Sequence, residues 1–501
     1  MTLPRTRFDY TAAPRPVAEL GAVHLVGIGG AGMSGIARML HARGIPVTGS
    51  DGRDSATLAA LRDEGIDVRV GHDAAAIAGV DTLVISSAIR EDNPEVTAAR
   101  AAGRPVLHRS QALAALAQGS ARRIAVAGAN GKTTTSSMLA VVLTLAGRDP
   151  SYAVGGDPVQ LAANARLGCG QVFVIEADES DGSFVGYRPQ VALVTSVQPD
   201  HLDFWGTEQG VAEGYRAFVD SITPGGVLVA CFDDPGAREL AGYAASRGVQ
   251  VVGYGESADA EVRLADLRPA GLGARAGVFV DGAAYELELV VPGEHNLLNA
   301  AGVLAIALYG LSSAGASGAD RTPEAVRTWL DLLSRFRGVR RRFERVGEVG
   351  GVTVVDDYAH NPAKVRAAVA TGRAAVGPAG RLVVLFQPHL YSRTRDFAAD
   401  FGAALASADV VLVADVYAAR EDPLPGVTGA LVADAVRATG SLAKVEFVAG
   451  ADRVLPALRA AVRSGDVVLT VGAGDVTTVG PALLAALAAD GAAADRRTGQ
   501  G

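Results

Sequence analysis

The sequence has few cysteines and no long apolar run. Its 501 residues include only Cys169 and Cys231, which form no CxxC pair, so neither a disulfide framework nor a cysteine-rich zinc site can be built from them. No stretch reaches the roughly 18 apolar residues of a transmembrane helix. The N-terminal segment has no apolar core of signal-peptide length. We therefore expect a cytoplasmic protein without a membrane partner.

Lysine is also scarce. Among 46 basic residues only Lys132, Lys364 and Lys444 are lysines, and 54 acidic residues bring the net charge to −8. That balance disfavours a general nucleic-acid-binding surface, so we expect no nucleic-acid partner. Hydrophobic residues make up 49% and charged residues 20% of the chain, values typical of globular proteins.

Strand-like apolar runs alternate with helical stretches along the whole chain. This alternation, together with glycines at the ends of apolar runs, predicts three consecutive α/β domains with parallel sheets. We place them at residues 1–120, 121–334 and 335–501. Within the middle domain, residues 261–291 alternate in strand fashion and predict a small antiparallel sheet. The chain after about Ala488 is low in complexity, which predicts a disordered tail.

The most specific local motif is Gly128-Ala-Asn-Gly-Lys132-Thr133-Thr, which follows the predicted strand 124–127. A glycine loop that opens a helix directs backbone N–H groups and the positive end of the helix dipole at an anion. Lys132 would add a charge near the β- and γ-phosphates, and the Thr133 hydroxyl could bind Mg²⁺. Val126 stands where the full GxxxxGK[ST] pattern has glycine, so the loop is a shortened form. A tight turn with an exposed lysine is the alternative, and the scarcity of lysine argues against it.

A second glycine loop follows the first predicted strand. Gly27, Gly29 and Gly32 match GxGxxG, and Asp51 lies 19 residues beyond Gly32 at the end of the next strand. This arrangement is typical of a pyrophosphate at a helix N-terminus with an acid for a ribose hydroxyl. NAD, FAD or a UDP-sugar could bind there, and a close-packed helix–strand turn is the structural alternative.

Polar side chains follow two strands of the predicted middle domain. Glu176 ends the strand 172–176, and His201 follows the strand 191–197. Because parallel strands present their carboxyl ends at one edge of a sheet, these side chains are expected beside the phosphate loop. The sequence therefore predicts a magnesium site there.

These motifs resemble the Mur ligase family, and the resemblance covers nearly the whole chain. The matching segments occur in the family's order: HLVGIGGAGMSGIA, SDGRDS, SSAIREDNPE, GANGKTTT, EADESDGSF, PDHLD, GEHNLLNA, RRRFE, DDYAHNP, FQPHLYSRT, DVYAAREDPLPGVTG and GAGDVTTVGP. The resemblance implies a Rossmann-like UDP-binding domain, a central P-loop ATPase-like domain and a C-terminal Rossmann-like domain that binds the amino acid. It also implies an enzyme of peptidoglycan precursor synthesis. That enzyme would use ATP and Mg²⁺ to join L-alanine to the lactyl carboxylate of UDP-N-acetylmuramate through an acyl phosphate.

The resemblance also assigns roles to individual residues. The residues implied for ATP are Gly128, Asn130, Gly131, Lys132, Thr133, Thr134, His295, Asn296, Asn299, Arg342 and Asp357. Those implied for the UDP-sugar are Gly27, Gly29, Gly30, Gly32, Ser34, Asp51, Ser86 and Ser87. The amino acid would meet Tyr358, His360, His389 and Arg393, with Arg393 on its carboxylate. The implied metal ligands are Thr133, Glu176 and His201, and the implied catalytic residues are Lys132, Glu176, His201 and His360.

Three positions depart from the family's pattern. Asn130 and Asn361 stand where histidines are usual, and Lys364 stands where an acid is usual. These departures leave open a related ligase for another amino acid or for a specialised pathway. Two alternatives are an NAD-dependent oxidoreductase built on the first glycine loop and a non-catalytic nucleotide-binding regulator. Each of them would leave one or more of the other motifs without a function. We expect a monomer or a weak homodimer.

Overall fold

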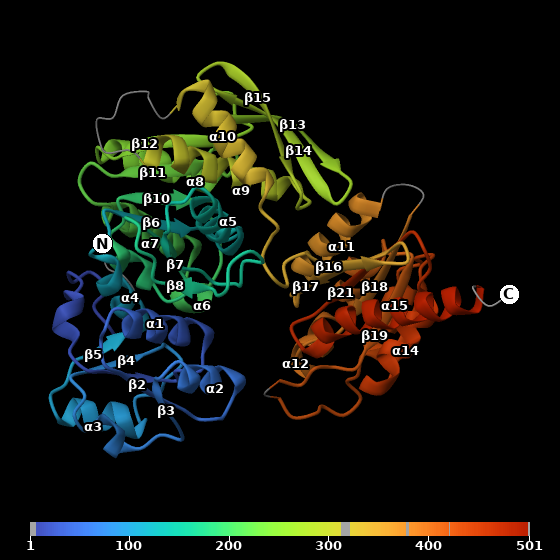
Figure 1. The fold of residues 1–501 in the computed structure, drawn as a ribbon, viewed down its shortest axis with the longest axis horizontal. Helices are drawn as coiled ribbons and strands as arrows, with labels where there is room; N and C mark the ends of the chain where they lie inside the picture. The colour runs from blue at the N-terminus through green and yellow to red at the C-terminus, as the bar shows by residue number, and fades with distance from the viewer. Residues whose placement is uncertain (1–6, 312–320, 377–379, 420, 499–501) are drawn as a thin grey trace. The chain divides into compact units, whose positions relative to one another are not determined.

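The fold of the chain consists of three sheets that follow one another along the sequence, each with flanking helices (Figure 1). It is seen in a computed structural model that describes residues 7–311, 321–376, 380–419 and 421–498. The contacts divide the chain into two compact units: Met1–Leu267 with Arg275–Leu289 and His295–Arg337, and Arg268–Ala274 with Val290–Glu294 and Gly338–Gly501. The three sheets confirm the predicted series of α/β domains.

The first sheet is parallel and has the strand order β3-β2-β1-β4-β5. Its strands are β1 (Val23–Val26), β2 (Val47–Asp51), β3 (Asp67–Val70), β4 (Thr82–Ile85) and β5 (Val106–His108). The helices of this region are α1 (Ala31–Ala42), α2 (Ala56–Asp63), α3 (Pro94–Ala101) and α4 (Arg109–Ala117). The strand order reverses between β1 and β4, so the glycine loop after β1 lies at the point where open α/β sheets bind ligands.

The middle sheet has ten strands in the order β15-β14-β13-β12-β11-β10-β6-β9-β7-β8. Its parallel centre consists of β12 (Gln250–Gly255), β11 (Val227–Cys231), β10 (Val191–Val194), β6 (Arg122–Ala127) and β9 (Val172–Glu176). β10 and β11 are buried along their whole length, which explains their continuous apolar sequences. The main helices of the region are α5 (Lys132–Leu145), α7 (Glu208–Asp220), α8 (Pro235–Ser246), α9 (Glu294–Ala305) and α10 (Pro323–Ser334).

The predicted small antiparallel sheet is instead an extension of this middle sheet. β13 (Val262–Ala270) pairs in parallel with β12, and β14 (Gly273–Val280) and β15 (Ala283–Leu289) continue from it (Figure 1). Two-residue connections require these three strands to alternate in direction. In the second connection Asp281 and Gly282 have φ values of 48° and 79°, as the tightest hairpin turns demand. Edge pairing with β12 could not be inferred from the alternation of residues alone.

The third sheet has the order β16-β17-β21-β18-β19-β20, and β16 is its single antiparallel strand. The strands are β16 (Glu344–Val349), β17 (Val352–Asp357), β18 (Arg381–Phe386), β19 (Val410–Ala414), β20 (Lys444–Val448) and β21 (Asp466–Val471). Its helices are α11 (Pro362–Val376), α12 (Tyr391–Leu405), α13 (Ala430–Ala438), α14 (Ala451–Ala461) and α15 (Val479–Thr498).

Helix α15 corrects the prediction of a disordered tail after Ala488, since it continues to Thr498. The sequence at the end of this helix is rich in alanine and therefore low in complexity, but alanine has the highest helix propensity of any residue. Among the described residues, no helix is long and apolar enough to cross a membrane.

Candidate active site

The phosphate loop connects β6 to α5 and ends at Gly131, the N-cap of α5, which carries no side-chain cap. Gly128 and Gly131 have φ values of 132° and 84°, a backbone region that side chains rarely adopt. A Cβ on Gly128 would lie 2.0 Å from Thr195 Oγ1, and one on Gly131 would lie 2.7 Å from Asn299 Oδ1. Both positions therefore require glycine, and the loop leads directly into the N-terminus of α5, the end of a helix that favours an anion.

Lys132, at the first position of α5, is held by the protein itself. Its Nζ donates to the carbonyl oxygen of Gly128 at 2.7 Å and to both carboxylate oxygens of Glu179 at 2.8 Å. The side chain of Glu179 is 2% exposed. Burial raises the pKa of Glu179, and the ammonium of Lys132 opposes that rise. Sequence reasoning did not single out Glu179, although it lies in the EADES segment after β9.

Glu176, at the end of β9, contacts the same loop from a second direction. Its carboxylate accepts the Thr133 hydroxyl at 2.8 Å, the Ser136 hydroxyl at 3.3 Å and the backbone N–H of Gly155 at 2.5 Å. The sequence therefore placed Glu176 correctly beside the phosphate loop. A carboxylate next to a threonine hydroxyl offers the hard oxygen ligands that Mg²⁺ prefers.

His201 lies next to two other acids of the same segment. One ligand atom from each of His201, Asp178 and Glu179 lies within 4.8 Å of the other two. His201 adopts a φ of 51° before the short helix α6 (Leu202–Trp205), and its backbone N–H donates to Asp200 at 2.8 Å. Polar groups that follow two strands therefore meet beside the phosphate loop, but the acids that His201 meets are Asp178 and Glu179, and the predicted Glu176 is not a member of this group.

The other predicted ATP residues of this domain lie on the loop and on α9. Asn130 donates from its side chain to Gln198 Oε1 at 3.3 Å, and Thr134 is half-buried in the first turn of α5. Asn299 donates to Asn296 Oδ1 at 3.3 Å, and both are buried, while His295 is exposed at the start of α9. The contact between Gly131 and Asn299 brings this amide pair to the phosphate loop.

The first glycine loop is fixed by the acid that follows β2. The N–H of Gly29 donates to Asp51 Oδ2 at 2.9 Å, and Gly27 has a φ of 75°. A Cβ on Gly29 would approach Leu58 Cδ1 to 2.5 Å and Asp51 Oδ2 to 2.9 Å, so a larger residue would displace the ends of these side chains. Gly30 and Gly32 flank the start of α1, and the buried Ser34 donates its hydroxyl to Ala31 O at 3.2 Å. Asp51 thus holds the loop that the family resemblance assigns to the sugar nucleotide.

Ser86 and Ser87, which follow β4, differ in their surroundings. Ser86 is half-buried, whereas Ser87 donates to Asp181 Oδ2 at 2.7 Å and lies 3.1 Å from His108 Nε2. Burial lowers the pKa of His108 to about 4, so this imidazole is neutral at neutral pH. The hydrogen bond of Ser87 connects the region of the first sheet to the EADESD segment of the middle domain. No local sequence motif predicts this contact.

The predicted amino-acid residues come together in the unit that contains Gly338–Gly501. Arg393 Nη1 lies 3.3 Å from the carbonyl oxygen of His360 and 3.4 Å from His389 Nδ1. The ring centroids of His360 and His389 are 6.1 Å apart, and Tyr358 meets His360 edge-on at 5.3 Å. Sequence reasoning missed Tyr417, whose ring stacks on His389 at 5.9 Å with an interplanar angle of 16°.

Arg342 and Asp357 lie in the same unit, before and at the end of β17. Asp357 accepts backbone N–H groups of Phe343 at 2.8 Å and Ala359 at 2.7 Å. Burial raises the pKa of Asp357 to about 6, against the opposing effects of these two hydrogen bonds and of Arg342. The carboxylate orders the backbone that leads to Tyr358 and His360.

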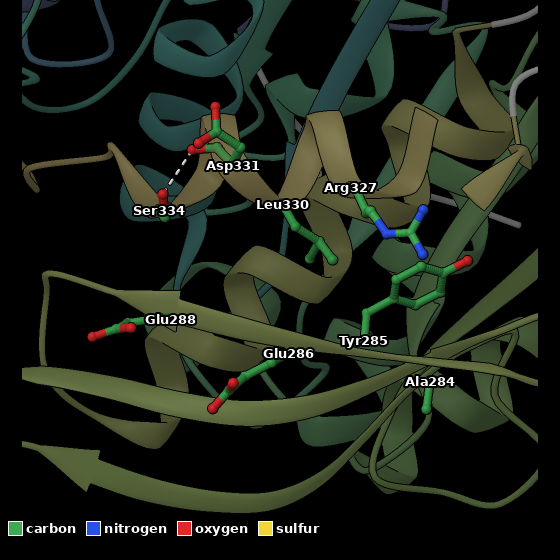
Figure 2. A pocket seen from close by; sticks show the side chains of 8 residues that line it. All are labelled: Ala284, Tyr285, Glu286, Glu288, Arg327, Leu330, Asp331 and Ser334. Atoms are coloured by element: carbon green, nitrogen blue, oxygen red, sulfur yellow. Dashed lines mark hydrogen bonds between the residues drawn. The ribbon is translucent and has the colours of Figure 1, made fainter. Parts of the chain in front are cut away.

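Two cavities of the first unit lie apart from these residues. The larger, of about 410 Å³, lies between β15 and α10 (Figure 2) and is lined by Ala284, Tyr285, Glu286, Glu288, Arg327, Leu330, Asp331 and Ser334. Glu288 pairs with Arg275 and Asp331 with Arg335, so these lining carboxylates are neutralised by protein groups. The second, of about 310 Å³, lies beside β1 and β2. Neither cavity contains a predicted site residue.

A phosphate loop flanked by carboxylates and a histidine, in the middle one of three α/β domains, defines a multidomain nucleotide-binding protein. Three family models match consecutive parts of the chain: "Mur ligase family, catalytic domain" at residues 22–121, "Mur ligase middle domain" at 126–307 and "Mur ligase, glutamate ligase domain" at 341–474. The chain belongs to the Mur ligase family.

Individual relatives cover almost the whole chain. A UDP-N-acetylmuramate–L-alanine ligase of Kineococcus radiotolerans is 57% identical over 482 residues, which are 95% of this chain and 98% of that protein. The enzyme of that name from Renibacterium salmoninarum is 51% identical over 94% of this chain and 97% of its own. The crystal structure of UDP-N-acetylmuramate–alanine ligase from Thermotoga maritima matches with a TM-score of 0.74 and 30% identity, covering 94% of this chain and 99% of that one.

Proposed function

We propose that this protein is an ATP-dependent ligase of peptidoglycan precursor synthesis that joins L-alanine to the lactyl carboxylate of UDP-N-acetylmuramate. The observation that carries the proposal is the match, over 95% of the chain at 57% identity, to a ligase of that name. The two separate glycine loops support it, because the reaction needs one site for ATP and another for a nucleotide sugar. An oxidoreductase would leave the Lys132 loop without a ligand.

The chemistry has two steps. A carboxylate oxygen of the substrate attacks the γ-phosphorus of ATP, the bond to the β,γ-bridging oxygen breaks, and ADP leaves. The amine of alanine then attacks the carbonyl carbon of the acyl phosphate, a tetrahedral species forms, and phosphate departs as the nitrogen loses a proton. The first step brings a carboxylate to a polyphosphate, and the second develops a negative oxygen beside a phosphate, so catalysis depends on positioning and neutralisation.

Lys132 and the first turn of α5 would bind the phosphates of ATP. The rest of the nucleotide site, around the phosphates and the nucleoside, would consist of Gly131, Asn130, Thr134, Asn296, Asn299 and His295. Thr133, Glu176 and His201 would hold Mg²⁺, which when bound supplies positive charge to the phosphate oxygens. The hydroxyl and carboxylate already meet at 2.8 Å, which fits a hard divalent cation. Arg342 and Asp357 are the remaining residues that the family resemblance assigns to ATP.

The glycine loop 27–32, with Ser34, Asp51, Ser86 and Ser87, would hold the UDP end of the sugar nucleotide. Tyr358, His360, His389 and Arg393 would surround alanine. Arg393 would pair with the carboxylate of the amino acid, because a guanidinium forms two parallel hydrogen bonds to it. His360 would lie next to the reacting amine; burial lowers the pKa of His360, which keeps its imidazole neutral and able to accept a proton.

We further propose domains at residues 1–120, 121–334 and 335–501, and a monomer or weak homodimer in the cytoplasm, where ATP and nucleotide sugars are available. The net charge of −8 supports the absence of nucleic-acid and membrane partners. Sedimentation of the purified chain measures its assembly.

Phosphate release from ATP tests the function directly. The assay contains the protein, ATP, Mg²⁺, UDP-N-acetylmuramate and each of the twenty amino acids in turn. We expect release that requires both the sugar nucleotide and an amino acid and is greatest with L-alanine. Equal release without the sugar, or none with any amino acid, would refute the ligase. A maximum with another amino acid would identify a related ligase.

A further inference from the structure

The ammonium of Lys132 has all of its donors engaged within the protein. An ammonium carries three N–H donors. They point to three acceptors, the carbonyl of Gly128 at 2.7 Å and the two oxygens of Glu179 at 2.8 Å. A phosphate oxygen can therefore be bound by Lys132 only after one of these hydrogen bonds has been given up.

Glu179 is the partner that a phosphate can replace. Like a phosphate, it presents two anionic oxygens, whereas Gly128 O belongs to the loop backbone. The backbone carbonyl of Glu179 accepts the indole N–H of Trp205 at 3.1 Å, which holds the residue against α6. This bond anchors the backbone of Glu179, so its carboxylate can move only as far as its own side chain allows.

Separation of the pair has a cost that falls on Glu179. Its side chain is 2% exposed, against 14% for that of Lys132. A buried carboxylate that loses its cation lacks both water and a counter-charge. Burial already raises the pKa of Glu179 while the lysine is present, in agreement with such a penalty. Nucleotide binding must supply the free energy that detaches Lys132.

We propose that Glu179 is a positioning residue that holds Lys132 before ATP binds and competes with the β- and γ-phosphates for its ammonium. The proposal rests on the proposed function, because it takes the loop to be the ATP site. The competition makes occupancy of the loop depend on a ligand with phosphates beyond the α-position. A nucleotide that lacks them leaves the Lys132–Glu179 pair intact.

Asp178 provides a matched control. It is the acid that directly precedes Glu179 in the sequence. Its carboxylate accepts the backbone N–H and the hydroxyl of Ser180 at 3.3 and 2.9 Å. Asp178→Asn removes the same unit of negative charge as Glu179→Gln without removing an acceptor of Lys132. Glu179→Asp keeps the charge and withdraws the carboxylate from Nζ by one methylene group.

The test is calorimetric titration of ATP and AMP into the full-length protein in EDTA, so that no metal contributes. In Glu179→Gln and in Glu179→Asp, ATP should bind about tenfold more tightly than in the unmodified chain, the scale of one charge-assisted hydrogen bond. AMP affinity should change less than twofold. The gain for ATP should vanish when Lys132→Met is added, and Asp178→Asn should give no comparable gain.

Three results would overturn the competition: unchanged or weaker ATP binding in both Glu179 variants, an equal gain in Asp178→Asn, or a gain that persists without Lys132. Having two Glu179 variants keeps the test decisive if one of them does not fold. A merely structural role for Glu179 would alter ATP and AMP binding together and would not depend on Lys132. If the unmodified chain binds no ATP even when Mg²⁺ replaces the EDTA, the proposed function itself fails.

Discussion

Replacing Lys132 by methionine should slow ligation by two to three orders of magnitude while leaving the sugar-nucleotide site intact. The side chain lies at the N-terminus of α5, and no other lysine occurs before residue 364, so no nearby lysine can take its place. Loss of one preorganised charge from a developing phosphate anion costs about 10²–10³ in turnover, which corresponds to roughly 3–4 kcal/mol. Methionine keeps most of the aliphatic volume, so packing around the loop is preserved.

The same replacement leaves Glu179 without its cation. Since that carboxylate is 2% exposed, we expect the protein to lose stability by about 1–3 kcal/mol, the cost of an unsatisfied buried charged group that can relieve itself by protonation. Glu179→Gln in the same chain should recover stability without recovering turnover. The two effects of Lys132 are thereby separated.

Two assays and one control decide the outcome. Phosphate release under saturating substrates measures turnover, and calorimetry measures UDP-N-acetylmuramate binding, which should stay within about twofold because that loop belongs to the first sheet. Lys444→Met, at the exposed start of β20, removes a lysine without touching either loop and should retain full activity. Turnover within tenfold of the unmodified enzyme would refute the role of Lys132. Loss of sugar-nucleotide affinity would refute the separation of the two sites.

Three further results are expected. Gly131→Ala should raise the ATP KM about tenfold without affecting sugar-nucleotide binding, because its Cβ would lie 2.7 Å from Asn299 Oδ1 at a φ of 84°. The free energy of unfolding should fall as the pH drops from about 6.5 toward 4, because His108 takes up a proton in the unfolded chain before it does so in the folded one. At pH 5 the loss, measured by urea titration, should be about 2 kcal/mol. His108→Asn should remove this pH dependence. Asn361→Ala should cost about 1 kcal/mol of stability, whereas Asn361→Asp should not.

Sequence patterns predicted those parts of the fold whose causes are local. β10 and β11 are buried on both faces, so they appear as continuous apolar runs, and β9 occupies the predicted residues. β3 was missed because one of its four residues is buried, which leaves no apolar run to recognise. The short strands β7 (Ser151–Ala153) and β8 (Ala165–Arg166) depend on pairing at the sheet edge rather than on their own sequence.

The candidate site divides in the same way. Both glycine loops could be found because the residues that form each of them are adjacent in sequence. Glu179 lies 47 residues from Lys132, and Asp181 lies 94 residues from Ser87, so neither partnership leaves a local signal. Tyr417 reaches His389 through a strand-like bridge between distant segments. Long-range pairs of single side chains are what the sequence of one chain does not reveal.

Hydrogen bonds within the protein explain the asparagines at positions 361 and 130, where the family usually has histidine. Asn361 precedes α11, and its side-chain oxygen accepts the backbone N–H of Lys364 at 2.9 Å, so it caps the helix that follows His360. Asparagine is among the best residues for that task. Asn130 has a comparable partner in Gln198. Since both amides are engaged within the protein, neither substitution by itself requires a different amino-acid substrate, and the proposal of alanine rests on the match to relatives named UDP-N-acetylmuramate–L-alanine ligase. Asn361→His in the amino-acid panel separates the two explanations: a cap predicts lower stability with an unchanged preference, whereas a specificity residue predicts a changed preference.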